Sequence, residues 1–107
     1  MSTMIDQCAH AFHEHLAGGP QAIIALMRDR AEAPEEQRAF ATLLINHLKT
    51  VARGDERDGA FEELIRLLID IGDLEQATLA LRSVGDVSRV DVGSFAEEIE
   101  RQLREAF

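Results

Sequence analysis

The sequence contains no tryptophan and no tyrosine, and its only aromatic side chains are five phenylalanines. A core built from this chain must therefore consist mainly of aliphatic side chains. Cys8 is the single cysteine, so no disulfide can form within the chain, which fits a reducing compartment. Lys49 is the only lysine, and the other basic residues are arginines that form no continuous basic stripe.

Long apolar runs are also missing. No segment approaches the ~20 apolar residues that a bilayer-crossing helix needs. The stretch Met1–Asp6 has neither the positive region nor the apolar region of a secretory signal. We therefore expect a cytoplasmic protein that has no membrane partner.

The charge is strongly one-sided, since 20 acidic residues face 11 basic ones and the formal net charge is −9. Such a surface repels phosphate backbones, so we expect no nucleic-acid partner. No Gly-Lys-Ser/Thr phosphate loop occurs either, and no motif indicates a cofactor. The charge is compatible with a basic protein partner, and it also serves solubility.

With 107 residues, of which 46% are apolar, the chain has the size and composition of one domain covering residues 1–107. Apolar residues recur at helical spacing in six places. The predicted helices cover about residues 3–17, 20–33, 34–53, 59–71, 74–84 and 94–106. Short connectors favour antiparallel neighbours. We predict an all-α domain of five or six helices packed as antiparallel hairpins.

Helix ends are predicted from capping residues. Asp73 can cap the helix that follows it, with Gln76 placed for a return bond, and Ser94 with Glu97 has the spacing of a capping box. Asp55–Gly59 is interpreted as a polar connector, and Val87–Gly93 is either a short helical turn or a loop. The helix over 59–71 is apolar around more than half of its circumference, so we expect it to be central.

The segment from Phe61 to Gly85 resembles a tetratricopeptide repeat, a helix–turn–helix unit of about 34 residues. Phe95 follows Phe61 by one such period. The positions that carry the resemblance are Phe61, Leu64 and Leu68 in the first helix, the turn Gly72–Asp73, and Ala77 and Leu81 in the second helix. The sequence departs from the family pattern at Ile65, Arg89 and Glu98.

The resemblance implies a tetratricopeptide-repeat-like fold, or a right-handed α–α superhelix, with residues 54–107 as the repeat-like half. It also implies a non-catalytic adaptor or small chaperone-like protein that binds a peptide or helix of another protein. A groove would be lined by the first helix of each pair, with Glu62, Arg66, Ile69, Asp70 and Glu100 among its residues.

Leu79 points away from the apolar stripe of its own helix. An exposed apolar side chain of this kind is typical of an interface with another protein or a second copy of the chain. We therefore add Leu79 to the predicted partner-binding residues, and a homodimer is possible. The alternative is that the N-terminal helices cover this side chain.

The first helix carries His10, His13 and Glu14 on neighbouring positions of one face. With a ligand from elsewhere they could hold a metal ion, but the same residues are ordinary surface pairs at i,i+4 spacing. His47 and Cys8 are interpreted as packing residues, and no nucleophile motif predicts an enzyme. Two alternatives to the adaptor hypothesis stay open, namely an acidic inhibitor or immunity-type protein that masks a basic surface, and a metal-binding helical protein.

Overall fold

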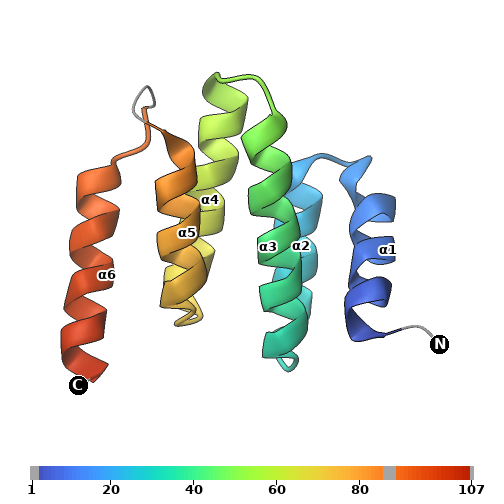
Figure 1. The fold of residues 1–107 in the computed structure, drawn as a ribbon, viewed down its shortest axis with the longest axis horizontal. Coiled ribbons are helices and arrows are strands. Elements are labelled where there is room, and N and C mark those ends of the chain that lie inside the picture. The colour runs from blue at the N-terminus through green and yellow to red at the C-terminus, as the bar shows by residue number, and fades with distance from the viewer. Residues whose placement is uncertain (1–2, 86–88, 107) are drawn as a thin grey trace.

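The computed structural model describes residues 3–85 and 89–106, and every regular element in these ranges is an α-helix. The prediction of an all-α domain with five or six helices is confirmed (Figure 1). None of the helices in these ranges combines the length and the apolar character that crossing a bilayer requires. The helices are α1 (Met4–Leu16), α2 (Pro20–Asp29), α3 (Pro34–Thr50), α4 (Asp55–Asp70), α5 (Leu74–Val84) and α6 (Val92–Ala106).

Each helix packs against the next one along the chain and also against the next but one. Figure 1 shows α3 and α5 in front of α2 and α4, with α1 and α6 at the two ends. The molecule measures 41 × 36 × 19 Å. Its short dimension corresponds to two layers of helices, since one helix with its side chains is about 10 Å across.

Helix α4 is one of two central helices: it packs against α2, α3, α5 and α6, as α3 packs against α1, α2, α4 and α5. The side chains of Phe61, Leu64, Ile65 and Leu68 are all 0% exposed. An apolar face this wide is buried because neighbours cover it from more than one direction. The predicted central position of this helix is therefore confirmed.

Side chains cap the N-terminal ends of α1 and α5, and the cap at Asp73 is the predicted one. The Thr3 hydroxyl accepts a hydrogen bond from the Asp6 amide, and the Asp6 carboxylate accepts one from the Thr3 amide. Asp73 caps α5 through its carboxylate, which accepts from the Gln76 amide at 3.2 Å. The predicted return bond from the Gln76 side chain to the Asp73 amide is not formed: the side chain is buried, and its Oε1 has no hydrogen-bond partner.

The predicted connector Asp55–Gly59 is wrong, since α4 begins at Asp55 and includes the whole segment. Acidic side chains in a first helical turn are stabilised by the positive end of the helix dipole, so a polar sequence there extends the helix. The predicted cap at Ser94 is also wrong. Helix α6 begins at Val92, and the Asp91 carboxylate accepts from the Ser94 amide at 3.1 Å. Of the ambiguous segment Val87–Gly93, residues 87 and 88 lie outside the described ranges.

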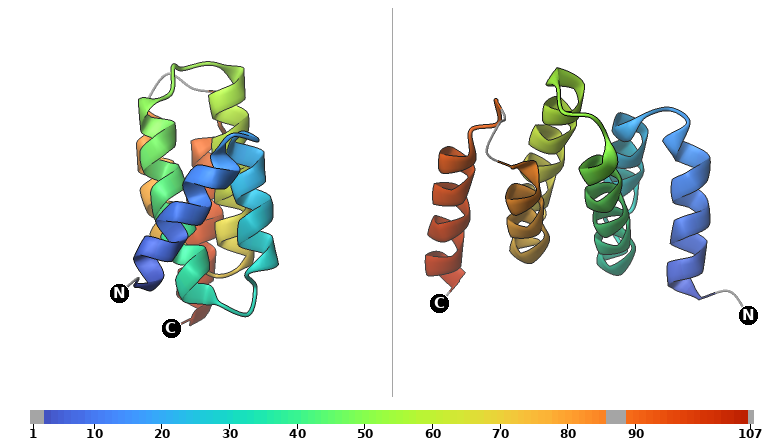
Figure 2. Two further views of the ribbon diagram at one scale, coloured as in Figure 1. Left: turned by 90° about the vertical axis from the view of Figure 1, so that its right-hand side faces the viewer. Right: turned by 45° about the horizontal axis from the view of Figure 1, so that its top comes forward.

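The first turn of α1 differs from its predicted packing. The spacing of Ile5, Cys8 and Phe12 predicts one buried stripe on this helix. Cys8 and Phe12 are indeed only 2% and 4% exposed, but Ile5 is 66% exposed. Figure 2 shows that α1 crosses the end of the α2–α3 pair obliquely. The crossing buries the middle of α1 and leaves Met4 and Ile5 at the surface.

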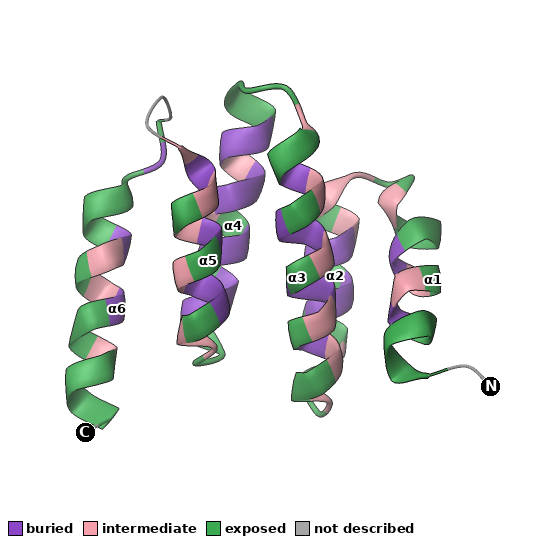
Figure 3. Cartoon of the chain, viewed as in Figure 1, coloured by how far each residue is buried: buried purple, intermediate pink, exposed green. Residues whose placement is uncertain are grey.

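Helix α6 buries only Phe95 and Ile99 among its described residues, and Figure 3 shows it exposed along most of its length. It also carries Glu98, which pairs with Arg101 at 2.6 Å and accepts from the Gln102 amide nitrogen Nε2 at 3.3 Å. The residues 34 positions before Glu98, Arg101 and Gln102 are the buried Leu64, Leu67 and Leu68 of α4. The end helix is therefore polar where the central helix is apolar.

Two glycines should respond oppositely to substitution by alanine. Gly72 follows α4 with φ of +81°, whereas Gly59 lies inside α4, and an added Cβ meets nothing within 4 Å at either position. We expect Gly72→Ala to lower the free energy of unfolding by about 1–2 kcal/mol, because L-residues are strained in the left-handed region. Gly59→Ala should raise it by about 0.5–1 kcal/mol through helix propensity. Urea unfolding of both variants measures this, and effects of the same sign would contradict the assignment.

Candidate protein-interaction surface

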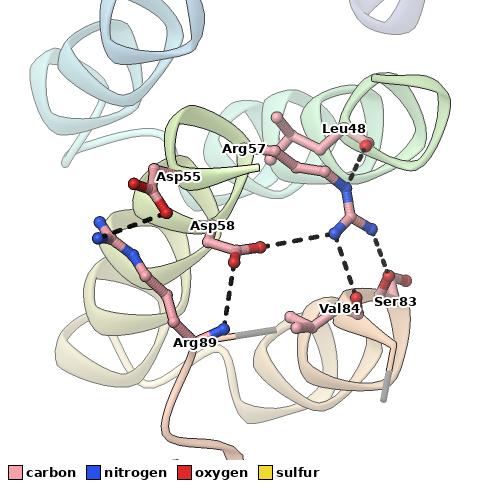
Figure 4. Close-up of polar contacts among 7 residues, drawn as sticks. All are labelled: Leu48, Asp55, Arg57, Asp58, Ser83, Val84 and Arg89. Carbon is pink, nitrogen blue, oxygen red and sulfur yellow. Dashed lines mark hydrogen bonds and ion pairs between the residues drawn. The ribbon is translucent and has the colours of Figure 1, made fainter. Parts of the chain in front are cut away.

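A cluster of charged residues is buried where α4 meets the ends of α3 and α5 (Figure 4). The Arg57 side chain is 5% exposed and lies over the Phe61 ring, with 4.8 Å between its Cζ atom and the ring centroid. Its Nε donates to the Leu48 carbonyl at 3.1 Å, Nη1 to the Val84 carbonyl at 3.2 Å, and Nη2 to the Ser83 carbonyl at 3.2 Å. One guanidinium thus binds carbonyls at the C-terminal ends of two helices, where the helix dipole favours positive charge.

Asp58 supplies the opposite charge. Its Oδ1 lies 3.7 Å from Arg57 Nη1, and its Oδ2 accepts from the Arg89 amide at 3.2 Å. Arg89 also pairs with Asp55 at 3.7 Å on the exposed side. Since Arg57 and Asp58 are buried and their partners are mainly backbone groups, we assign this cluster to holding α3, α4 and α5 together. The sequence pattern does not predict this cluster, because both residues fall in the segment Asp55–Gly59 that the pattern assigns to a connector.

The histidines do not assemble into a site. His10 Nε2 lies 3.0 Å from Glu14 Oε1 on the exposed face of α1, in the i,i+4 arrangement expected of a surface pair. His47 is half-buried and meets Phe12 edge-on, with 6.3 Å between ring centroids. Within residues 3–85 and 89–106, no group of three or more His, Cys, Asp or Glu side chains could hold a metal ion.

Cys8 is a packing residue in this fold. Burial raises the pKa of its thiol, and the nearby Glu36 carboxylate raises that pKa further. A thiol with a raised pKa stays protonated at neutral pH, and the thiol is a far weaker nucleophile than the thiolate. The interpretation of Cys8 as an inert core side chain is consistent with this environment.

Three of the predicted partner-binding residues share one face of α4. Glu62, Arg66 and Asp70 follow each other at four-residue spacing, and Arg66 and Asp70 are exposed. The Arg66 guanidinium lies over the Phe95 ring of α6, with 5.1 Å between its Cζ atom and the ring centroid. This face of α4 therefore meets α6, and the binding role of the three residues stays a prediction.

The other three predicted residues do not join one continuous patch with them. Ile69 is 2% exposed and belongs to the core, so it is not accessible to a partner. Glu100 is exposed on α6. Leu79 is 43% exposed, one turn after Glu75, which pairs with Arg38 of α3. Leu79 therefore lies on the outer side of the α3–α5 layer rather than beside Arg66.

A different surface gathers exposed apolar side chains from several elements. An open hollow between α1 and α3 adjoins a second hollow at the α2–α3 turn, and a third reaches the α4–α5 turn. We call the three together the α3 edge. Its lining residues are Met4, Ile5, Glu32, Ala33, Pro34, Glu35, Glu36, Gln37, Arg38, Ala39, Thr42, Ile71, Gly72 and Asp73.

Apolar character at the α3 edge comes from Met4, Ile5 and Ile71, which are 37%, 66% and 38% exposed. The α1–α3 hollow exists because α3 presents the small side chains Ala39 and Thr42 opposite Ile5. These two positions lie three residues apart and so share a helix face. A partner side chain could pack there without moving α3.

The charge at the α3 edge is negative. Four carboxylates and one guanidinium line the three hollows. Arg38 is engaged by Glu75, and Arg30 pairs with Glu36 at 3.7 Å. Glu32 and Glu35 form no ion pair within the described part of the chain. Exposed apolar groups are thus bordered by carboxylates whose charge is not neutralised locally.

Comparisons with protein families, with curated proteins and with solved structures found no match to this chain.

Proposed function

We propose that this chain is a non-catalytic protein-interaction module, an adaptor or small chaperone-like protein that binds a peptide or helix of another protein. The observation that carries the proposal is the α3 edge, where Met4, Ile5 and Ile71 are exposed beside unpaired carboxylates. Met4 and Ile5 share the α1–α3 hollow, and Ile71 lines the neighbouring hollow at the α4–α5 turn. Exposed apolar side chains grouped in this way are typical of interfaces. Scattered single apolar residues would not support the same conclusion.

The likeness to tetratricopeptide repeats is part of this proposal. It is supported by the spacing of Phe61 and Phe95, which both lie in the core, and by the packing of each helix on the next and the next but one. Repeat arrays of this kind bind partners along extended surfaces. The proposed binding surface differs from the groove that the resemblance implies, since the exposed apolar groups gather at the α3 edge.

An acidic inhibitor or immunity-type protein is the second candidate, favoured by the net charge of −9 and by the unpaired Glu32 and Glu35. The two candidate functions differ in the interaction that provides affinity, which is charge attraction for the inhibitor and apolar packing for the adaptor. Masking of a basic surface by charge alone weakens steeply with salt, whereas apolar packing does not. Titration of an identified complex between low and high salt separates them.

Site-specific photo-crosslinking tests the proposed function. A photoreactive residue at Thr42, beside the α1–α3 hollow, should capture discrete proteins in native lysate, whereas the same residue at the exposed Glu63 of α4 should not. The captured proteins should disappear with Ile5→Asp and persist with Leu103→Asp, whose site on α6 is 41% exposed. Identical capture from both positions, or persistence in the Ile5 variant, would contradict the proposal.

A further inference from the structure

We infer that the α3 edge accepts a basic amphipathic α-helix of a partner protein, an inference that rests on the proposed function. The α1–α3 hollow offers an apolar wall, Met4 and Ile5, and a floor of small side chains, Ala39 and Thr42. An amphipathic helix presents apolar side chains at i, i+3/i+4 and i+7, which is the pattern that fills such a hollow. Flanking basic residues on the same helix would meet the surrounding carboxylates.

The charges at the α3 edge indicate that the partner is positively charged. Glu32 and Glu35 stand at the α2–α3 turn and the start of α3 without a basic partner in the described part of the chain. The other two carboxylates of the lining are already engaged, Glu36 with Arg30 and Asp73 as the cap of α5, so Glu32 and Glu35 carry the free charge. Lysine or arginine side chains of a docked helix would neutralise this charge, and electrostatic complementarity of this kind directs association.

The same charges disfavour the other occupants of an apolar surface. A second copy of this chain would place its own carboxylates against Glu32 and Glu35, and each copy carries a net charge of −9. Anionic lipid headgroups would be repelled for the same reason. A polyproline segment needs a groove lined by aromatic rings, and the lining residues of the α3 edge include none.

The apolar wall is also held in place before a partner arrives. The reciprocal hydrogen bonds of Thr3 and Asp6 fix the first turn of α1, and Met4 and Ile5 are part of that turn. Side chains on a formed helix lose less freedom on binding than side chains on a flexible segment. The edge is therefore preorganised for a rigid partner such as a helix.

Three synthetic peptides test the inference by isothermal titration at physiological salt. The first is an amphipathic helix with leucines on one face and lysines on the other, the second has glutamates in place of the lysines, and the third is a scrambled form of the first. We expect the first peptide to bind and the acidic peptide not to bind. The scrambled peptide should bind at least about tenfold more weakly than the first. Equal binding of the first and third peptides would overturn the inference, because it would show charge attraction without a fitted apolar face.

Matched variants locate the binding. Ile5→Ser and Glu35→Gln should each weaken the first peptide, the former by about tenfold, while Leu103→Ser and Glu97→Gln at exposed sites on α6 should not. Circular dichroism should show all four variants folded, because each site is at the surface. The inference would be overturned if the two α6 variants weakened the first peptide as much as Ile5→Ser and Glu35→Gln do. A dimer in sedimentation equilibrium that Ile5→Ser dissociates would do so as well, since a second copy would then be the occupant.

The two proposals can fail separately. If crosslinking at Thr42 captures proteins in an Ile5-dependent manner and no peptide binds, the basic helix is wrong and the interaction function stands. If Ile5→Ser weakens binding of the first peptide and crosslinking captures nothing, the α3 edge can bind a basic amphipathic helix, but the proposed function is wrong.

Discussion

Replacement of Arg57 by methionine is expected to lower the free energy of unfolding by about 3–5 kcal/mol, the range for removing one partner of a buried ion pair. Methionine keeps much of the volume but none of the five N–H donors. The Asp58 carboxylate would stay buried beside an apolar side chain. The carbonyls of Leu48, Ser83 and Val84 would also lose the donor that they share. Urea unfolding followed by circular dichroism measures the loss.

The control for this variant is Arg101→Met on α6. Arg101 pairs with Glu98, but its side chain is 59% exposed, and an exposed pair contributes only about 0–1 kcal/mol. Arg57→Lys provides a second comparison. An ammonium group on a flexible stem cannot reproduce the fork that reaches carbonyls of two helices, so lysine should recover little of the loss. Similar losses for Arg57→Met and Arg101→Met would show that the buried cluster is not important for stability.

Substitution of Phe61 by alanine is expected to cost about 3–5 kcal/mol, the range for removing a large buried aromatic side chain. Phe61 is 0% exposed in the central helix α4. The matched control is Phe95→Ala, 34 residues later. Phe95 is 8% exposed in the end helix α6, where the surroundings can relax and water can enter. Phe95→Ala should therefore lower the free energy of unfolding by less than Phe61→Ala does. The opposite order in denaturant unfolding would contradict the central role of α4.

Phe61 and Arg57 should not act independently, because the guanidinium lies over the ring at 4.8 Å. Residues in contact show interaction energies of about 0.5–3 kcal/mol in double-mutant cycles. The double variant Arg57→Met, Phe61→Leu should therefore lose less stability than the two single changes together. Additive losses would indicate that the ring does not hold the guanidinium in place.

Helix positions follow from the sequence because they depend on local patterns. The spacing of apolar residues and the cap at Asp73 are short-range signals, and each corresponds to an observed helix or helix end. The connector Asp55–Gly59 shows where this reasoning fails. A polar segment is either a loop or a first helical turn. Here Arg57 of that turn binds carbonyls of Val84 and Ser83 in α5, which lie 27 and 26 residues away and which local patterns do not reveal.

The surface was harder to predict than the helices. Exposure depends on which neighbour covers a side chain, and helical periodicity does not contain that information. Ile5 matched the buried stripe of its helix and is exposed because α1 crosses its neighbours obliquely, whereas Ile69 was expected in a groove and lies in the core. Leu79 points outward, as its position off the apolar stripe indicated. Only the angles between helices, which side-chain packing across the whole domain determines, distinguish these cases.

The polar surface of α6 has a consequence for the molecule at high concentration. A second molecule that approached α6 end-on would have to remove water from Glu98 and Arg101, which already satisfy each other. The free energy needed to dehydrate these charged groups exceeds the free energy gained from a contact with the second molecule. Association of a second molecule through Glu98 and Arg101 of α6 is therefore disfavoured.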